Sequence, residues 1–426
     1  MSWRGAYIPP LRDLPTRCTK PDLRPGRDRC AVCPFRHRRA RLLSACPVIT
    51  MTNTAQLLRD LIALPSVNPA FLPDGDAHAG ERRVAEFLAA TAAQCGLEVE
   101  LIEVLPGRPN LLARLTPTGK VRYRVLLAPH TDTIGSDLDS NFIPREKAGR
   151  LYGRGACDTK GSVAAMLSAL GEVAAAKQRP AATEIVFAAL MDEENAQAGS
   201  RALVASGLKA DLAIVGEPTL GQVVTAHKGS LWLKLETRGK AAHGAKPELG
   251  VNAIREMAGV VTLLETEYAR ALSRQHHPLL GHGTVNVGVI TGGRQPNVVP
   301  DRCEIVIDRR TLPGETEAGV RREIGALLRR SGLEATMTGT KLAPCLPLET
   351  DPRLPLVQQL GACAGQASLL GVDYFCDAAV LSAGGIPSVV FGPGDIAQAH
   401  TADEWIARKS LERAKSILVR FLSSLP

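Results

Sequence analysis

The chain has 426 residues, of which 45% are hydrophobic and 22% are charged, a composition typical of soluble globular proteins with room for two domains. No apolar run reaches the ~18 residues of a membrane span, and ten scattered cysteines do not indicate a disulfide framework. The start of the chain also lacks the apolar stretch of a secretory signal, so we expect a cytoplasmic protein.

The formal net charge of +8 lies entirely within residues 1–50, which hold eleven Lys and Arg against three Asp. Residues 51–426 hold forty basic and forty acidic side chains, so we expect no nucleic-acid partner for this main body. Residues 1–50 show no sustained hydrophobic period and predict a disordered extension or an overlong translation start. Two weaker alternatives are half of a zinc site at Cys30 and Cys33, and an import leader, against which three Asp residues weigh.

From Met51 onward the hydrophobic pattern is regular. It predicts helices over 54–64, 80–95, 162–175 and 197–206, and strands over 97–104, 110–115, 122–127, 184–190 and 212–215. Strands that alternate with helices indicate an α/β domain in layers, with a sheet flanked by helices.

After Pro218 the pattern changes. Strands are predicted over 228–237, 284–290, 302–308 and 334–338, and helices over 252–273 and 315–330, which together suggest a small ferredoxin-like α+β domain. The α/β pattern then returns, with helices near 354–364 and 378–383, a strand over 387–391 and a C-terminal helix from about residue 403. We therefore predict a main domain over 51–224 and 340–426, with residues 225–339 inserted into it.

Acidic and imidazole side chains follow the ends of several strands predicted in the main domain. They are His130 and Asp132 after one strand, Asp158 in a Gly-rich turn, Glu193 and Glu194 after the next strand, Glu217 in Gly-Glu-Pro-Thr, and His400 after the last strand. In an open α/β sheet, ligands bind at the carboxyl ends of the strands. The repeated occurrence of these residue types there predicts a single polar site.

The residue types suit a pair of divalent metals. Two histidines and three carboxylates supply five ligands, and one bridging carboxylate would give each metal one imidazole and two carboxylates. Such a set fits Zn²⁺, with Co²⁺ or Mn²⁺ as alternatives. One further carboxylate is needed as a base for water, and the adjacent pair Glu193 and Glu194 would supply one ligand and one base.

The motifs HxD, GRGxxDxKG, DEE, GEPT, HG and GPG…AHT occur in this order over residues 51–426. Together they resemble the M20 family of dinuclear-zinc metallopeptidases and amidohydrolases. The resemblance implies a zinc-exopeptidase-like catalytic domain, a mixed sheet flanked by helices, with an inserted ferredoxin-like lid that also forms a homodimer. Pro129 and Thr159 depart from the family's usual residues, but both lie outside the ligand set.

The resemblance also implies a role for each candidate residue. His130 and Glu217 would bind one metal, Glu194 and His400 the other, Asp158 would bridge them, Asp132 would orient His130, and Glu193 would be the general base. In the inserted segment, His243 would stabilise the oxyanion, usually in the partner subunit's site, and Asn297 would bind substrate. Arg310, favoured over its neighbour Arg309, would hold the substrate carboxylate, together with backbone N–H groups of Gly384 and Gly385.

Other conspicuous residues have structural interpretations. We expect His227 to be exposed or structural, Cys157 to fill a tight turn, and Lys160 to mark the start of a helix rather than bind substrate.

The expected reaction is hydrolysis of the amide bond of an N-acyl amino acid, in which a water shared by the metals attacks the carbonyl and Glu193 is the base. The segment from Gly392 to Glu404 most resembles the acetylornithine deacetylase branch. Alternatives within the family are a succinyl-diaminopimelate desuccinylase, an aminoacylase, and a dipeptidase or carboxypeptidase. A metal-stabilised scaffold whose N-terminal arm contacts nucleic acid is a non-enzymatic alternative, which the complete ligand set disfavours.

Overall fold

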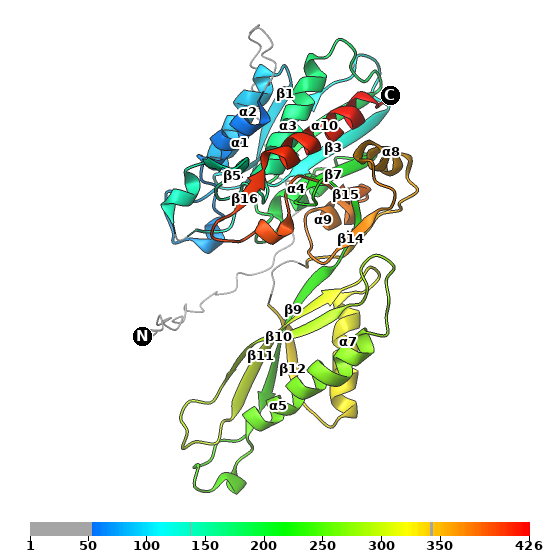
Figure 1. The fold of residues 1–426 in the computed structure, drawn as a ribbon. Helices are drawn as coiled ribbons and strands as arrows, with labels where there is room; N and C mark the ends of the chain where they lie inside the picture. The colour runs from blue at the N-terminus through cyan, green and yellow to red at the C-terminus, as the bar shows by residue number, and fades with distance from the viewer. Residues whose placement is uncertain (1–52, 137, 341–343) are drawn as a thin grey trace, which may run out of the picture. The chain divides into compact units, whose positions relative to one another are not determined.

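The computed structural model describes residues 53–136, 138–340 and 344–426. The predicted extension 1–50, with its cysteine pair, lies outside them. The described residues form a large mixed sheet covered by helices, a separate four-stranded sheet and a short three-stranded sheet (Figure 1). None of their helices is both long and apolar enough to cross a membrane.

The large sheet has the strand order β1-β2-β6-β3-β7-β15-β8-β13, and β14 also pairs with β8. Its strands are β1 (Glu98–Leu105), β2 (Arg108–Leu115), β3 (Tyr123–Pro129), β6 (Thr183–Ala189), β7 (Leu212–Gly216), β8 (Val224–His227), β13 (Leu348–Glu349), β14 (Leu370–Val372) and β15 (Ser388–Val390). The four neighbours β6, β3, β7 and β15 are parallel. Because helices cover both faces there, β6 and β7 are buried along their whole length, which explains their continuous apolar runs.

Helices on one face of this sheet share a single hydrophobic core. They are α1 (Thr54–Ile62), α2 (Arg82–Gln94), α3 (Lys160–Ala175), α8 (Pro355–Ala364) and α10 (Arg408–Ser423). Two shorter helices, α4 (Ala198–Ala205) and α9 (Ala378–Ala383), contribute to the core on the other face. Helix α3 is rich in Ala, Gly and Ser and is buried on almost every side, so its backbone approaches the sheet closely. The predicted α/β class with a mixed sheet is confirmed.

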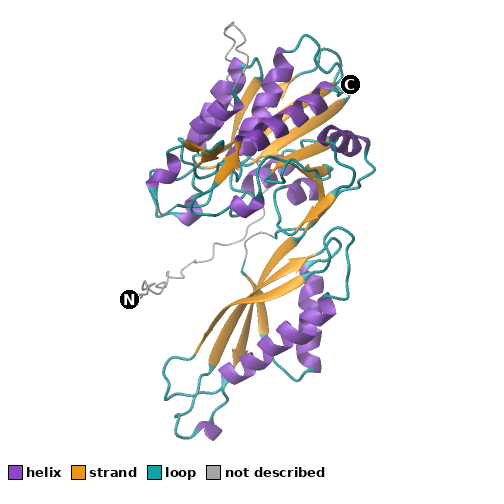
Figure 2. Cartoon of the chain, viewed as in Figure 1, coloured by secondary structure: helices purple, strands orange, loops and turns teal. Residues whose placement is uncertain are grey.

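Residues 229–339 form a second, four-stranded antiparallel sheet with its own core, which we call the inserted sheet (Figure 2). Its order is β10-β11-β9-β12, from β9 (Gly229–Arg238), β10 (Thr284–Gly292), β11 (Arg302–Thr311) and β12 (Thr336–Gly339). Helices α5 (Ala253–Leu263) and α7 (Glu317–Arg330) pack on it, and α5 continues through a π turn (Leu264–Tyr268) into α6 (Ala269–Leu272). Strand β11 alternates buried and partly buried residues, as expected for a sheet covered on one face.

Several short elements escape the sequence prediction. They are the three-stranded sheet of β4 (Arg145–Lys147), β5 (Arg150–Tyr152) and β16 (Trp405–Ala407), the strands β8, β13 and β14, and 3-10 turns at Pro69–Phe71, Asp139–Phe142, Pro247–Leu249 and Ile396–Gln398. The C-terminal helix begins at Arg408, later than predicted, because residues 405–407 pair with β5 instead. Strands of two to four residues are too short to show a hydrophobic period.

Candidate metal centre

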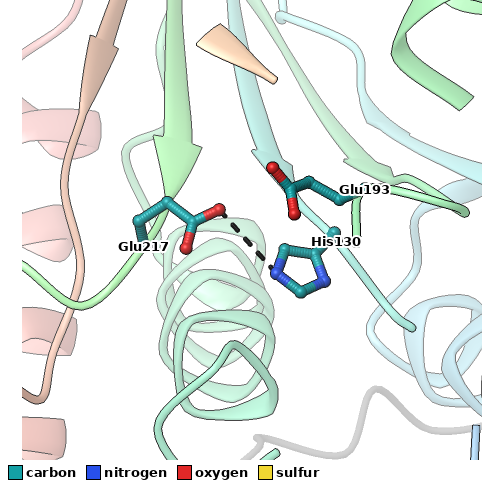
Figure 3. Close-up of side chains that lie close together, drawn as sticks. All are labelled: His130, Glu193 and Glu217. Carbon is teal, nitrogen blue, oxygen red and sulfur yellow. Dashed lines mark ion pairs between the residues drawn. The ribbon is translucent and has the colours of Figure 1, made fainter. Parts of the chain in front are cut away.

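The predicted site residues of the main domain meet where the parallel strands end. His130 directly follows β3, and β3 lies between β6 and β7. Glu193 and Glu194 follow β6, and Glu217 directly follows β7. Figure 3 shows His130, Glu193 and Glu217 with their side chains gathered at this edge.

Asp158 lies between the two histidines. Its Oδ1 is 3.2 Å from His130 Nε2, and its Oδ2 is 3.3 Å from His400 Nε2. His400 Nε2 also lies 3.2 Å from an oxygen of Glu194, and His130 Nε2 lies 3.7 Å from an oxygen of Glu217. One carboxylate thus faces both imidazoles, and each imidazole faces one further carboxylate.

The ligand atoms are close enough to share ions. In His130, Glu193 and Glu217, one atom of each side chain lies within 4.8 Å of the others, and the same holds for His130, Asp158 and Glu194. His130 belongs to both groups. Glu193 therefore lies beside His130 and Glu217 (Figure 3). Glu194 belongs to the second group, with His130 and Asp158.

Burial and the closeness of like charges shift the pKa values of these side chains. Burial, with a further contribution from Glu217, raises the pKa of Glu193 well above its ordinary value. Burial and nearby Asp158 raise the pKa of Glu194 to about 7. Hydrogen bonds to Asp158 and Glu194 raise the pKa of His400 to about 10. The raised pKa values mean that the surroundings do not compensate the negative charge that these carboxylates would carry when ionised. A bound cation would supply that compensation.

Two buried oxygens without a hydrogen bond support the same conclusion. Among the described residues, Glu194 Oε1 and Glu217 Oε1 are buried and accept no hydrogen bond. A buried carboxylate oxygen without a donor is costly, and a divalent cation is a partner that removes the cost. Imidazole nitrogen and carboxylate oxygen are ligands that Zn²⁺, Co²⁺ and Mn²⁺ accept, so the residues present fit a metal centre.

Glu404 shapes the turn that carries Asp158. Its buried carboxylate accepts hydrogen bonds from the backbone N–H groups of Gly155, Cys157 and Asp158, at 2.7–2.9 Å. The guanidinium of Arg154 pairs with the same carboxylate at 2.9 Å. Asp158 is therefore held by a residue some 250 positions away, which the sequence prediction quoted within a motif but gave no role.

Asp132 contacts both His130 and the loop after β6. His130 Nδ1 is 3.0 Å from the Asp132 backbone carbonyl oxygen and 3.4 Å from its carboxylate. The carboxylate accepts hydrogen bonds from the backbone N–H groups of Glu193 (3.0 Å) and Glu194 (3.1 Å). These contacts direct Nε2 of His130 toward Asp158 and Glu217 and link His130 to the loop that carries Glu193 and Glu194.

The expected residues of the inserted sheet lie in a different setting. His243 and Asn297 are exposed, and their segments are joined by a hydrogen bond of 2.7 Å from the N–H of Gly244 to the carbonyl of Asn297. Nothing in the described residues connects either side chain to the metal cluster. The segments that carry His243 and Asn297 therefore lie side by side.

Arg309 and Arg310 have opposite environments. The Arg309 side chain is fully buried, donates to the hydroxyl of Tyr268 and pairs with Glu315. The Arg310 side chain is 31% exposed and lines a cavity of about 470 Å³ together with Lys228, Thr284, Asp373 and Tyr374. Only Arg310 is open to a ligand.

The prediction for Gly384 and Gly385 is wrong. Both residues end helix α9, where the N–H of Gly384 donates to the Val380 carbonyl and the N–H of Gly385 donates to the Ser382 carbonyl. These N–H groups are occupied by the helix terminus. In addition, the two glycines precede β15, whereas the cluster lies where the strands end.

Sequence reasoning also missed Asn68, Arg108 and Asp377. Asn68 donates to Asp132 at 2.8 Å, and Arg108 pairs with Asp192 at 3.0 Å. Asp377 is buried, accepts a hydrogen bond from Ser200 at 2.5 Å, and has its pKa raised to about 7 by burial. All three are single polar residues beside ordinary turns or helix starts, and only the fold brings them to the site.

Comparison with known proteins identifies the family. The model of Peptidase family M20/M25/M40 matches residues 126–424. The chain belongs to this family. It is therefore a metal-dependent hydrolase that acts on amide bonds, with a deacetylase-like function.

The chain is similar to an acetylornithine deacetylase from Edwardsiella ictaluri (strain 93-146), with 32% identity over 379 residues, covering 86% of this chain and 96% of the relative. Among solved structures, the aminopeptidase PepT from Bacillus cereus ATCC 10987 aligns with a TM-score of 0.71 and 22% identity over 87% of this chain and 97% of that chain. The Bacillus subtilis YXEP protein, described as a dinuclear metal-binding peptidase of the M20 family, aligns with a TM-score of 0.64 and 13% identity over 87% and 96%. These structural similarities confirm the fold.

Proposed function

We propose that this enzyme hydrolyses the amide bond of N-acetyl amino acids and resembles the acetylornithine deacetylases in its substrate. The observation that carries this proposal is the position of Asp158 between His130 and His400, with Glu193 in the same cluster. Acetylornithine deacetylases that align over almost their full length support the choice of acyl group.

The residues that would hold two metals divide around Asp158. His130 and Glu217 would hold one ion, Glu194 and His400 the other, and Asp158 would contact both. We propose Zn²⁺, with Co²⁺ or Mn²⁺ as substitutes. When bound, such a pair lowers the pKa of a water molecule and polarises the substrate carbonyl.

Glu193 would move the proton. Its carboxyl group lies beside His130 and Glu217, and burial raises its pKa, so it can hold a proton taken from the attacking water. The same group would then return the proton to the leaving amine. Asp132 would position this base through the hydrogen bond to the Glu193 backbone. His243, from the inserted sheet, would donate to the oxyanion.

Arg310 would bind the carboxylate of the substrate. The cavity that it lines includes Tyr374, whose hydroxyl donates to the carbonyl of Pro218, next to the ligand Glu217. A guanidinium with exposed N–H groups suits a carboxylate, since the two can form paired hydrogen bonds. Asn297 would bind substrate from the same side as His243.

The inserted sheet would also form a homodimer. Strand β10 pairs only with β11 in the described sheet, so its other edge is open, and it exposes Val289 (54%) and Ile290 (57%). An open apolar edge favours pairing with a second chain. A two-fold interface at this edge would give each site access to a His243 of the other subunit.

A metal-reconstituted amidase screen tests the proposal. The purified protein would be loaded with Zn²⁺, Co²⁺ or Mn²⁺ and assayed on N-acetyl, N-succinyl and N-formyl amino acids and on dipeptides. We expect the highest kcat/KM for an N-acetyl substrate such as N-acetylornithine. A preference for N-succinyl substrates would indicate a desuccinylase, and a preference for dipeptides would indicate a dipeptidase; either result would overturn the proposed substrate.

A further inference from the structure

A buried polar network lies under the loop that follows β6. We call residues 191–198, which carry Glu193 and Glu194, the base loop. The network joins it to three segments that are distant in sequence: Asn68 after α1, Glu81 at the start of α2, and Arg108 at the start of β2. No motif of the family resemblance includes these three residues.

Asn68 links two carboxylates. Its Nδ2 donates to Asp132 Oδ2 at 2.8 Å and to Asp192 Oδ1 at 2.9 Å. Asp132 in turn accepts the backbone N–H groups of Glu193 and Glu194. The Asn68 amide therefore connects Asp132 to Asp192. Asp132 contacts the backbone of Glu193 and Glu194, and Asp192 immediately precedes them.

Arg108 holds the other side of the same loop. Its Nε and Nη2 donate to the two oxygens of Glu81 at 2.7 and 2.6 Å, and Nη2 also donates to Asp192 Oδ1 at 3.0 Å. Glu81 then accepts the backbone N–H of Asp192 at 3.2 Å. The side chain and the backbone of Asp192 are thus both fixed by one ion pair.

The conformation of Asp192 shows why the loop needs this support. Its φ is 68°, in the left-handed region, which costs energy for a residue with a side chain. Its carbonyl accepts the N–H of Gln197, and its Oδ2 accepts the N–H of Ala198, so the whole base loop turns around it. A residue held in this conformation requires contacts that over-determine it.

The charges of the network make its members depend on one another. Glu81, Asp132 and Asp192 are almost fully buried, and Arg108 is the cation that pairs with two of them. Buried carboxylates are stable only when paired or supplied with donors. Asn68 supplies a donor to both Asp132 and Asp192, so a second acceptor cannot replace its amide.

We propose that Asn68 and Arg108 are positioning residues that set the direction of Glu193 and Glu194. The connections end on the side chain or backbone of Asp192 in the base loop, or on Asp132, which accepts hydrogen bonds from that loop. A displacement of about 1 Å in such a group costs roughly 10²-fold in rate. The proposal rests on the proposed function of Glu193 as the base.

The variant Asn68→Asp tests the two hydrogen bonds that Asn68 donates to Asp132 and Asp192. It has nearly the same shape and retains the oxygen that accepts the N–H of Ala70, but it replaces the donor to Asp132 and Asp192 with an acceptor. We expect kcat to fall by roughly 10- to 100-fold while KM changes by less than about threefold and the bound metal content stays the same. A folded, metal-loaded variant with wild-type kcat would overturn the proposal.

The variants Arg108→Gln and Arg108→Lys test the contacts of Arg108 with Glu81 and Asp192. We expect Arg108→Gln to lower kcat, and Arg108→Lys, which restores the positive charge, to recover part of it. Arg82→Gln is the matched control, because Arg82 pairs with Glu103 at the surface of the same region, and we expect its loss to leave kcat unchanged. If Arg108→Gln does not fold, Asn68→Asp alone decides.

Hydrogen exchange separates this inference from the proposed reaction. We expect amide exchange of residues 191–198 to accelerate in Asn68→Asp and not in Arg82→Gln, whatever substrate the enzyme prefers. If the wild-type protein cleaves none of the amides assayed, the proposed function fails, while exchange still tests the positioning. Unchanged exchange in Asn68→Asp would overturn the positioning role even in an active enzyme.

Discussion

The edge of the large sheet and the inserted sheet differ in how completely they hold their functional residues. At the edge, His130, Asp158 and Glu217 are between 2% and 8% exposed, and each lies against another member of the cluster. In the inserted sheet, His243 and Asn297 are exposed, and a backbone hydrogen bond joins their two segments. The first group is assembled by the fold of one chain. The contacts of the second group with substrate or with another subunit belong to the proposed function.

The largest expected effect comes from the edge. Glu193→Gln keeps the shape of the side chain but removes the carboxylate proposed to accept the proton, so we expect kcat to fall by roughly 10²- to 10⁴-fold. Metal content, measured by elemental analysis, stays at the wild-type level, because Glu193 is not among the proposed ligands. Glu86→Gln, an exposed change on α2, serves as the control with normal turnover. Near-normal turnover of Glu193→Gln would show that another group is the base.

A smaller effect is expected from the inserted sheet. His243→Ala removes the proposed oxyanion donor, so we expect kcat to fall by roughly 10²- to 10³-fold, with little change in stability because the side chain is exposed. Its folded state is checked by thermal unfolding.

Mixing two inactive variants tests whether His243 acts across the proposed dimer. A subunit with Glu193→Gln still supplies His243, and a subunit with His243→Ala still supplies Glu193, so their mixed dimers contain one complete site. After the mixture is unfolded and refolded together, we expect roughly a quarter of wild-type activity, the yield of random two-fold pairing. No recovery in verified mixed dimers would contradict the assignment across subunits.

The same contrast explains what sequence can predict. His130, Asp158, Glu217 and His400 were predictable because each residue type follows a recognisable strand or Gly-rich turn, and parallel strands bring their carboxyl ends together. Glu404 and Asn68 were not, since a single carboxylate or amide in a loop has no pattern, and its partner is fixed only by the tertiary fold. Gly384 and Gly385 show the opposite error, because a glycine pair fits both an anion-binding loop and the end of a helix.

Two neighbouring arginines on β11, one buried and one partly exposed, should have different effects on stability and on substrate binding. Arg310→Ala removes an exposed donor and should raise KM by roughly 10- to 100-fold, since a hydrogen bond to a charged group contributes about 1.5–3 kcal/mol. Arg309→Ala removes a fully buried side chain and leaves the partly buried Glu315 without its ion-pair partner, so it should lower the free energy of unfolding by roughly 3 kcal/mol, with KM unchanged in the folded fraction. Steady-state kinetics and urea unfolding distinguish the two, and an exchange of these phenotypes would show that Arg309 is the substrate ligand.

The smallest expected effect concerns His227, on β8 of the large sheet. Burial lowers the pKa of this imidazole from 6.5 to about 4, and its Nδ1 lies 2.9 Å from the Lys228 carbonyl. Between these two values, the unfolded chain binds a proton that the folded protein excludes. Stability is therefore retained above pH 6.5 and falls as the pH drops toward 4, by up to about 1.4 kcal/mol per pH unit.

Urea unfolding at pH 6.5 and 4.5 measures this contribution as the difference between variants, which removes the effect of other titrating groups. His227→Gln should lose less stability than the wild type over this interval, by roughly 2 kcal/mol. His276→Gln, at an exposed position within the inserted segment, should retain the full wild-type dependence, because its imidazole meets solvent in both states. Equal slopes for His227→Gln and the wild type would mean that the buried imidazole already accepts a proton in the folded protein.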